Sequence, residues 1–235
     1  MKKSYSKVMD YSIKDIFLAG YVSAQAGTYF NQVIMVTELA EYDDENVIEE
    51  YASLFKKVKE SGKLYVDNIK YVAQVANKHR IPLPDLPKHP EQYFKWIKAV
   101  QLGFSGERMP EEISPAYFTH ASHLGDLTTS LYILDNYIYL HQKFGALDYS
   151  ESIKTLLDDI LKLRADVDQV NNDSVTPKNQ KTIDEGWKTL FDMAGQFAEF
   201  RKEELRQEEL EELGELVNQL IDKSSSYAHK IAEKL

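Results

Sequence analysis

Cysteine is absent from the 235-residue chain, and this absence excludes several kinds of chemistry. A chain without thiols has no disulfide, no thiolate nucleophile and no cysteine-ligated zinc site. A chain of this length can still bury a substantial core without such cross-links. Because proteins of a reducing compartment seldom use disulfides, we expect a soluble, cytoplasmic protein.

Clustered positive charge is also lacking. The formal net charge is −10, from 38 Asp and Glu against 28 Lys and Arg, and no long basic run occurs. Nucleic acids are bound through clustered Lys and Arg that contact phosphates, so we expect no nucleic-acid partner for this acidic chain. The first residues, MKKSYSKVMDYSIKD, carry no apolar stretch directly after the lysines, and therefore predict no secretory signal.

Proline is scarce, and four of the seven prolines lie in IPLPDLPKHP, residues 81–90. Residues before proline disfavour the helical region, so this segment is predicted to be an extended connector. Elsewhere apolar residues recur every three or four positions, and no alternating strand pattern is flanked by turn signals. The sequence predicts one all-α domain over residues 1–235, with about four long antiparallel helices plus one or two extra helices.

The predicted helices differ in length and exposure. The short helix near 91–104 could form part of a crossover connection, a layout that resembles ferritin-like bundles in shape only and implies no function. The last helix, from about 179, could be broken at Gly214 or near 224–226. Its glutamate-rich part, 199–235, could project from the bundle and pair with another chain. The expected helices cover about 12–42, 44–79, 91–104, 115–144, 150–170 and 179 to near the C-terminus.

Residues 16–37 form an uncharged run that is long enough to span a bilayer. However, Gln25, Asn31 and Gln32 interrupt it, whereas a spanning helix is more uniformly apolar. We therefore favour a buried helix over a membrane span. The second charge-poor segment, 114–140, contains only two charged residues, so both segments are expected at the centre of the bundle.

Small residues mark the first of these helices at four-residue spacing. Gly20, Ala24 and Thr28 fall on one helical face, and small side chains on one face let two helix backbones approach closely. The sequence therefore predicts that the helix over 12–42 packs tightly against a neighbour through this face.

Two histidines, His120 and His123, share the apolar face of the helix near 115–144. Histidines three residues apart on a helix can hold one divalent metal with a further ligand from another helix, and Glu38 or Glu41 is the nearest candidate. Alternatively, both histidines are buried and hydrogen-bonded to nearby polar groups.

Catalytic motifs are missing. The chain has no Glu-x-x-His pair of the di-iron bundles, no nucleophile elbow, no phosphate-binding glycine loop and no HExxH zinc motif. The sequence therefore requires no cofactor and favours a protein that is not an enzyme, although helical enzymes also assemble sites from scattered residues.

Two functional hypotheses follow from these patterns. The first is a non-catalytic helical bundle that acts by binding a partner protein or a second copy of itself. The second is a small-molecule or single-metal site in the bundle core, with an enzymatic or sensory use. For this site we predict residues from two facing helices: Gln25, Tyr29 and Gln32 from one, and Tyr117, His120 and His123 from the other.

Overall fold

The computed structural model describes residues 13–39, 45–88, 90–104, 114–144 and 148–235. Within these ranges the chain forms seven α-helices and one short 3₁₀ helix, and no strand, which confirms the predicted all-α bundle. The elements are α1 (Ile13–Leu39), α2 (Glu45–Lys78), α3 (Pro90–Phe104), α4 (Ala116–Lys143), α5 (Ser150–Asp168), α6 (Pro177–Ala194), η1 (Gly195–Phe200) and α7 (Gln207–Lys234).

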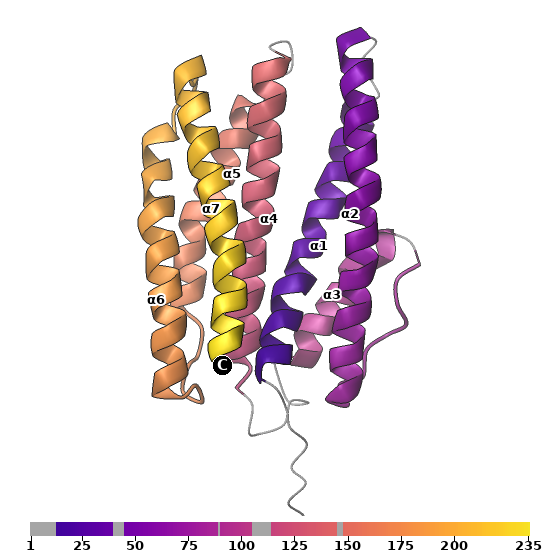
Figure 1. Ribbon diagram of the computed structural model, residues 1–235, viewed down its shortest axis with the longest axis vertical. Helices are drawn as coiled ribbons and strands as arrows, with labels where there is room; N and C mark the ends of the chain where they lie inside the picture. The colour runs from indigo at the N-terminus through magenta and orange to yellow at the C-terminus, as the bar shows by residue number, and fades with distance from the viewer. Residues whose placement is uncertain (1–12, 40–44, 89, 105–113, 145–147) are drawn as a thin grey trace, which may run out of the picture.

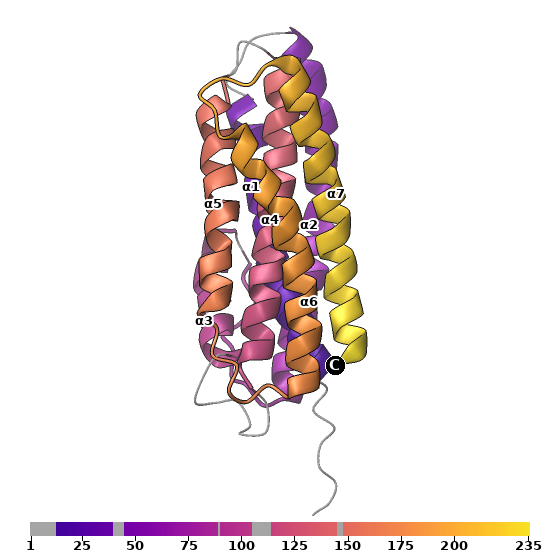
Figure 2. The same ribbon diagram turned by 90° about the vertical axis from the view of Figure 1, so that its left-hand side faces the viewer.

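Helices α4 to α7 run alternately up and down and form a four-helix arrangement, and α1 and α2 lie side by side next to it (Figures 1 and 2). Helix α1 is the element that joins the two parts. It runs parallel to α4, because Gly20 faces Ala121 while Thr28 bonds Thr129 further along both helices. It runs antiparallel to α7, which Tyr21 reaches at Ser225.

The parallel arrangement of α1 and α4 requires a return connection. Helix α2 runs back along α1, residues 81–88 are extended as predicted, and α3 leads to the start of α4. Tyr93 at the beginning of α3 stacks on Phe30, with the ring centroids 4.7 Å apart. Phe104 at its end stacks on Phe118 at 4.8 Å. The short helix is therefore the crossover segment that the sequence predicted.

Glycines bring α1 and α4 into close contact. A Cβ atom added to Gly20 would lie 2.5 Å from the carbonyl oxygen of Phe118. A Cβ atom added to Gly125 would lie 2.4 Å from the carbonyl oxygen of Tyr21 and 2.7 Å from the Cβ of Ala24. Each helix thus presents small residues to the backbone of the other, which confirms the predicted close approach and adds Gly125 as its counterpart.

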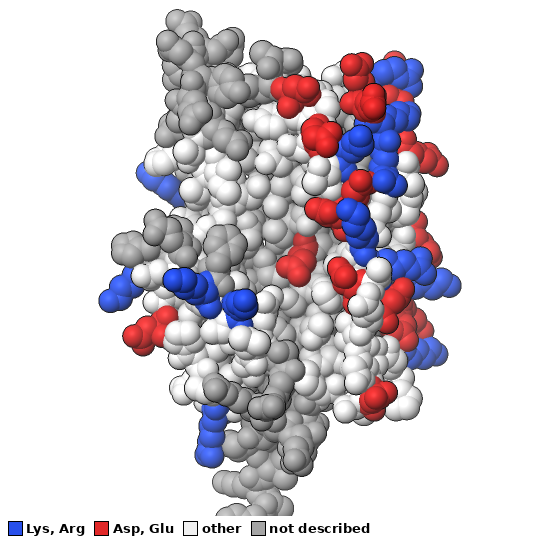
Figure 3. All heavy atoms as spheres, turned by 180° about the vertical axis from the view of Figure 1, so that it is seen from behind, with Lys and Arg blue, Asp and Glu red and all other residues white. Residues whose placement is uncertain are grey.

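The charge-poor helices α1 and α4 occupy the middle of the molecule, where their apolar side chains meet those of the surrounding helices. On the face opposite to that of Figure 1, charged side chains of both signs gather on the α5 and α6 side, while the middle carries few (Figure 3). No helix among the described residues combines the length and apolar character that crossing a membrane requires.

The C-terminal region differs from the prediction in two ways. The helical region is interrupted at residues 195–206, where η1 and a short non-helical segment separate α6 from α7, and not at Gly214. Gly195 ends α6, a capping box of Arg206 and Glu209 begins α7, and Phe197 between them is fully buried. Helix α7 does not project: its apolar side chains Leu213, Val217 and Leu220 are all buried within the bundle.

Candidate functional site: an α5/α6 cleft and an α2/α7 groove

The predicted ligand-binding residues do not form a single site. His120 lines a cleft between α5 and α6, whereas Gln25, Tyr29 and Gln32 line a pocket between α1, α2 and α4. The two pockets share no lining residue. Helices α1 and α4 are parallel neighbours, but the polar side chains in question lie on different sides of the pair. The expected meeting of the two sets of side chains is therefore not present.

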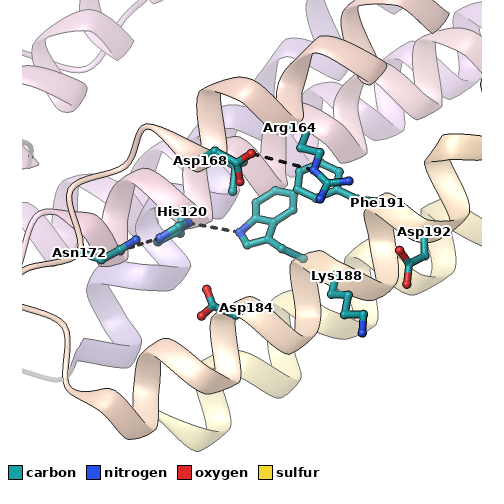
Figure 4. Close-up of a pocket in the computed structure, with 10 residues that line it drawn as sticks. His120, Arg164, Asp168, Asn172, Asp184, Lys188, Phe191 and Asp192 are labelled. Atoms are coloured by element: carbon teal, nitrogen blue, oxygen red, sulfur yellow. Dashed lines mark hydrogen bonds and ion pairs between the residues drawn. The ribbon is translucent and has the colours of Figure 1, made fainter.

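The first pocket, the α5/α6 cleft, has a volume of about 320 Å³ and lies at the seam between two antiparallel helices (Figure 4). Its floor contains His120 and Trp187, both buried, while its rim consists of charged side chains. The lining residues are His120, Arg164, Val167, Asp168, Asn172, Asp184, Trp187, Lys188, Phe191 and Asp192.

His120 is held by hydrogen bonds at both ring nitrogens. The indole Nε1 of Trp187 donates to its Nδ1 at 3.2 Å, so the Nδ1 atom carries no proton. The Nε2 atom lies 2.9 Å from Oδ1 of Asn172 and donates to it. Burial lowers the pKa of His120, which keeps this neutral tautomer at neutral pH. Both nitrogens are therefore occupied, and the arrangement matches the hydrogen-bonded alternative for this residue.

The other predicted residues of this helix lie apart from the cleft. Tyr117 is buried, and its hydroxyl oxygen accepts a hydrogen bond from Nδ2 of Asn179 at 2.9 Å. His123 is half-buried and lines none of the pockets described here, and burial lowers its pKa. The side chain of Glu38 and the whole of Glu41 lie outside the described part of the chain. Among the described residues, no group of three or more His, Asp or Glu side chains is placed to hold a metal ion.

The second pocket has a volume of about 260 Å³ and contains no charged side chain among its lining residues. Tyr29 stacks on Tyr65 of α2, with ring centroids 5.0 Å apart and planes 14° apart. Gly62 allows this arrangement, because a Cβ atom there would lie 2.9 Å from the Tyr29 ring. Gln25 donates to the hydroxyl oxygen of Tyr21 at 3.0 Å, whereas Oε1 of Gln32 is buried and accepts no hydrogen bond in the structure.

A third pocket, of about 410 Å³, lies between α2, α4 and α7. The second pocket includes Leu64 of α2 and Tyr132 of α4, and the third includes Lys57 and Tyr139. Both pairs are seven residues apart on antiparallel helices, so the pockets follow each other by about two helical turns. We call the combined surface the α2/α7 groove. Its lining residues are Gln25, Ala26, Thr28, Tyr29 and Gln32 of α1, Lys57, Leu64, Tyr65 and Asn68 of α2, Tyr132, Asp135, Asn136, Ile138, Tyr139 and Gln142 of α4, and Leu210, Glu211, Gly214, Glu215 and Asn218 of α7.

Large apolar side chains are exposed along this groove. Leu64 is 62% exposed, Tyr132 38% and Tyr139 39%, although each lines a pocket. Sequence reasoning missed these residues because Tyr132 and Tyr139 lie on a helix that is apolar on most sides. Their spacing of seven residues was the available signal, since it places both on one face of α4.

Comparisons of this chain with protein-family models, with curated proteins and with solved structures find no match, so any functional proposal rests on the geometry of the groove and the cleft.

Proposed function

We propose that this protein is a non-catalytic binding protein whose α2/α7 groove receives an amphipathic helix of a partner protein. The observation that carries the proposal is the succession of two pockets along one groove, with Leu64, Tyr132 and Tyr139 exposed beside them. Exposed large apolar side chains that line a concavity are typical of an interaction site. Tyrosine is also among the residues most enriched at protein interfaces.

The dimensions of the groove favour a helical occupant. Its α2 wall runs from Lys57 to Asn68, which corresponds to about 16 Å or three turns of helix. A partner helix presents apolar side chains at positions i, i+3, i+4 and i+7, and two such clusters can fill two successive pockets. The walls and the floor are themselves helices, so the occupant meets ridges and grooves of matching spacing.

The charged residues that line the groove predict the charge along one edge of the partner helix. Asp135, Glu211 and Glu215 line its α7 side, whereas Lys57 is the one cation among the described lining residues. Burial raises the pKa of the Asp135 carboxyl group, and this effect outweighs the hydrogen bond from Asn218 at 3.0 Å and the positive charge of Lys57, which both lower it. A partner cation beside Asp135 would relieve this cost. We therefore expect an apolar stripe flanked by Lys or Arg on the edge that faces α7.

Site-specific photo-crosslinking tests the proposal. A photoreactive amino acid is placed at Leu64, at Tyr139 or, as a control, at Lys181, an exposed residue of α6 that lines neither the groove nor the cleft. After irradiation in the cells of origin, the cross-linked peptides are identified by mass spectrometry. We expect the two groove positions to give one common partner segment, with apolar residues at helical spacing and a basic edge. We expect Lys181 to give no such adduct.

Binding of that segment, made as a synthetic peptide, is then measured by calorimetry. The substitution Tyr139→Glu should weaken it at least about tenfold, or about 1.4 kcal/mol, because it places a charge in the apolar contact. It should lower the free energy of unfolding by no more than about 1 kcal/mol, since the Tyr139 side chain is partly exposed and interacts with the side chains of Lys57 and Lys143. An adduct between two copies of the chain, or an acidic or extended partner segment, would contradict the proposal.

A further inference from the structure

The α5/α6 cleft combines an aromatic wall with a fixed geometry. Trp187 and Phe191 stack at 5.0 Å with their planes 15° apart, and both line the cleft. The hydrogen bond from the Trp187 indole to His120 sets the orientation of the ring, and His120 is itself fixed by Asn172. The aromatic surface is therefore held in place before any ligand arrives, which lowers the entropic cost of binding.

The aromatic wall already has a cation beside it. The guanidinium of Arg164 lies over the Phe191 ring, 5.7 Å from its centroid, and also pairs with Asp168 at 4.0 Å. Aromatic faces attract cations through the ring quadrupole. The position of Arg164 demonstrates that this part of the cleft accommodates a positively charged group between an aromatic ring and a carboxylate.

Across the cleft, the carboxylate of Asp184 on α6 forms no ion pair with another described residue, whereas Asp168 is paired with Arg164. Asp168 from α5 and Asp184 from α6 lie on opposite sides of His120, while the ammonium group of Lys188 points away from it (Figure 4). Asp184 accepts one hydrogen bond, from the uncharged amide of Gln180 at 2.6 Å. Burial lowers the pKa of His120, so the imidazole adds no positive charge there at neutral pH.

We propose that the α5/α6 cleft binds a small organic cation, namely a primary amine carried on an aromatic body. The aromatic body would lie against Trp187, and the ammonium group would pair with Asp184. The volume of about 320 Å³ is at the lower end of the range for small-molecule pockets and suits a ligand of this size. The cleft shares no lining residue with the groove, so the two proposals are independent.

Nuclear magnetic resonance offers a direct test, because the chain contains only two tryptophans. The two indole N–H signals are followed during titration with phenethylamine and, separately, with 2-phenylethanol, which has the same ring but no charge. The signals are assigned with the variant Trp96→Phe. We expect phenethylamine to shift the Trp187 signal to saturation, with a Kd on the order of 1 mM, and to leave Trp96 unchanged.

The charge dependence is the decisive part of the test. 2-Phenylethanol should bind about fivefold more weakly or worse, because it lacks the cation. Asp184→Asn should weaken phenethylamine binding about threefold, a value suited to an exposed carboxylate. Asp159→Asn, an exposed position on α5 outside the cleft, should leave binding unchanged. Equal binding of the amine and the alcohol, an unaffected Asp184→Asn variant, or an unmoved Trp187 signal would overturn the proposal.

Discussion

The contact between α1 and α4 can be tested by adding a single methyl group. In Gly125→Ala the new Cβ would lie 2.4 Å from the carbonyl oxygen of Tyr21 and 2.7 Å from the Cβ of Ala24. Two helices must therefore move apart, since backbone has no alternative rotamer. Overpacking of a core costs about 1–3 kcal/mol, and a backbone clash lies at the upper end of this range.

A helix also gains about 1 kcal/mol when alanine replaces glycine, which offsets part of the cost. We therefore expect Gly125→Ala to destabilise the protein by about 2 kcal/mol, or to lower its Tm by about 4–8 °C for a chain of this size. Circular dichroism at increasing temperature, or in urea, measures the change.

The matched control is Gly214→Ala in α7. There the nearest atom to the new Cβ would be Cγ2 of Ile138, at an ordinary 3.8 Å. This variant gains the helical preference without a clash and should be more stable by about 0.5–1 kcal/mol. The reasoning is refuted if Gly125→Ala is as stable as the wild type, or if both variants change in the same direction.

Two further predictions concern buried polar groups. Because burial lowers the pKa of His120 below its ordinary 6.5, its contribution to stability is present above pH 6.5 and is lost as the pH falls toward its folded-state pKa. When the free energy of unfolding is measured in urea from pH 7.5 down to pH 5, that of the wild type should fall relative to that of His120→Gln. A difference between the two proteins that does not change with pH would contradict the lowered pKa of His120. The hydroxyl of Tyr93 donates to the carbonyl oxygen of Ser23 at 2.5 Å. Tyr93→Phe should therefore lower the free energy of unfolding, measured in urea, by about 1 kcal/mol. An unchanged free energy would mean that this hydrogen bond gives no net stabilisation.

The sequence was informative about features that depend on neighbouring residues. Apolar spacing predicted most of the helices, and four prolines predicted the extended segment before α3. Small residues at four-residue spacing predicted the close approach of α1. The interruption at residues 195–206 was not predicted, although Gly195 at the C-cap of α6 and the capping box of Arg206 and Glu209 at the start of α7 were local signals for it.

The candidate sites depended on contacts between distant residues. Asn172 and Trp187, which bond His120, lie 52 and 67 positions away along the chain. The sequence placed a histidine on an apolar helical face, but a metal site and a hydrogen-bonded core site share that pattern. Only the packing of α4 against the α5–α6 pair brings the indole and the amide to the imidazole.

What the sequence by itself determined is therefore the helical character of the chain, the position of its connector and the central place of its two charge-poor helices. These properties follow from periodicity and from backbone restrictions that act over a few residues. The tertiary structure alone decided that α7 packs inside the bundle, that the predicted polar residues separate into a cleft and a groove, and that Leu64 and Tyr139 remain exposed. These outcomes depend on which helical faces pack against each other, and that choice is made by the packing of all the helices together.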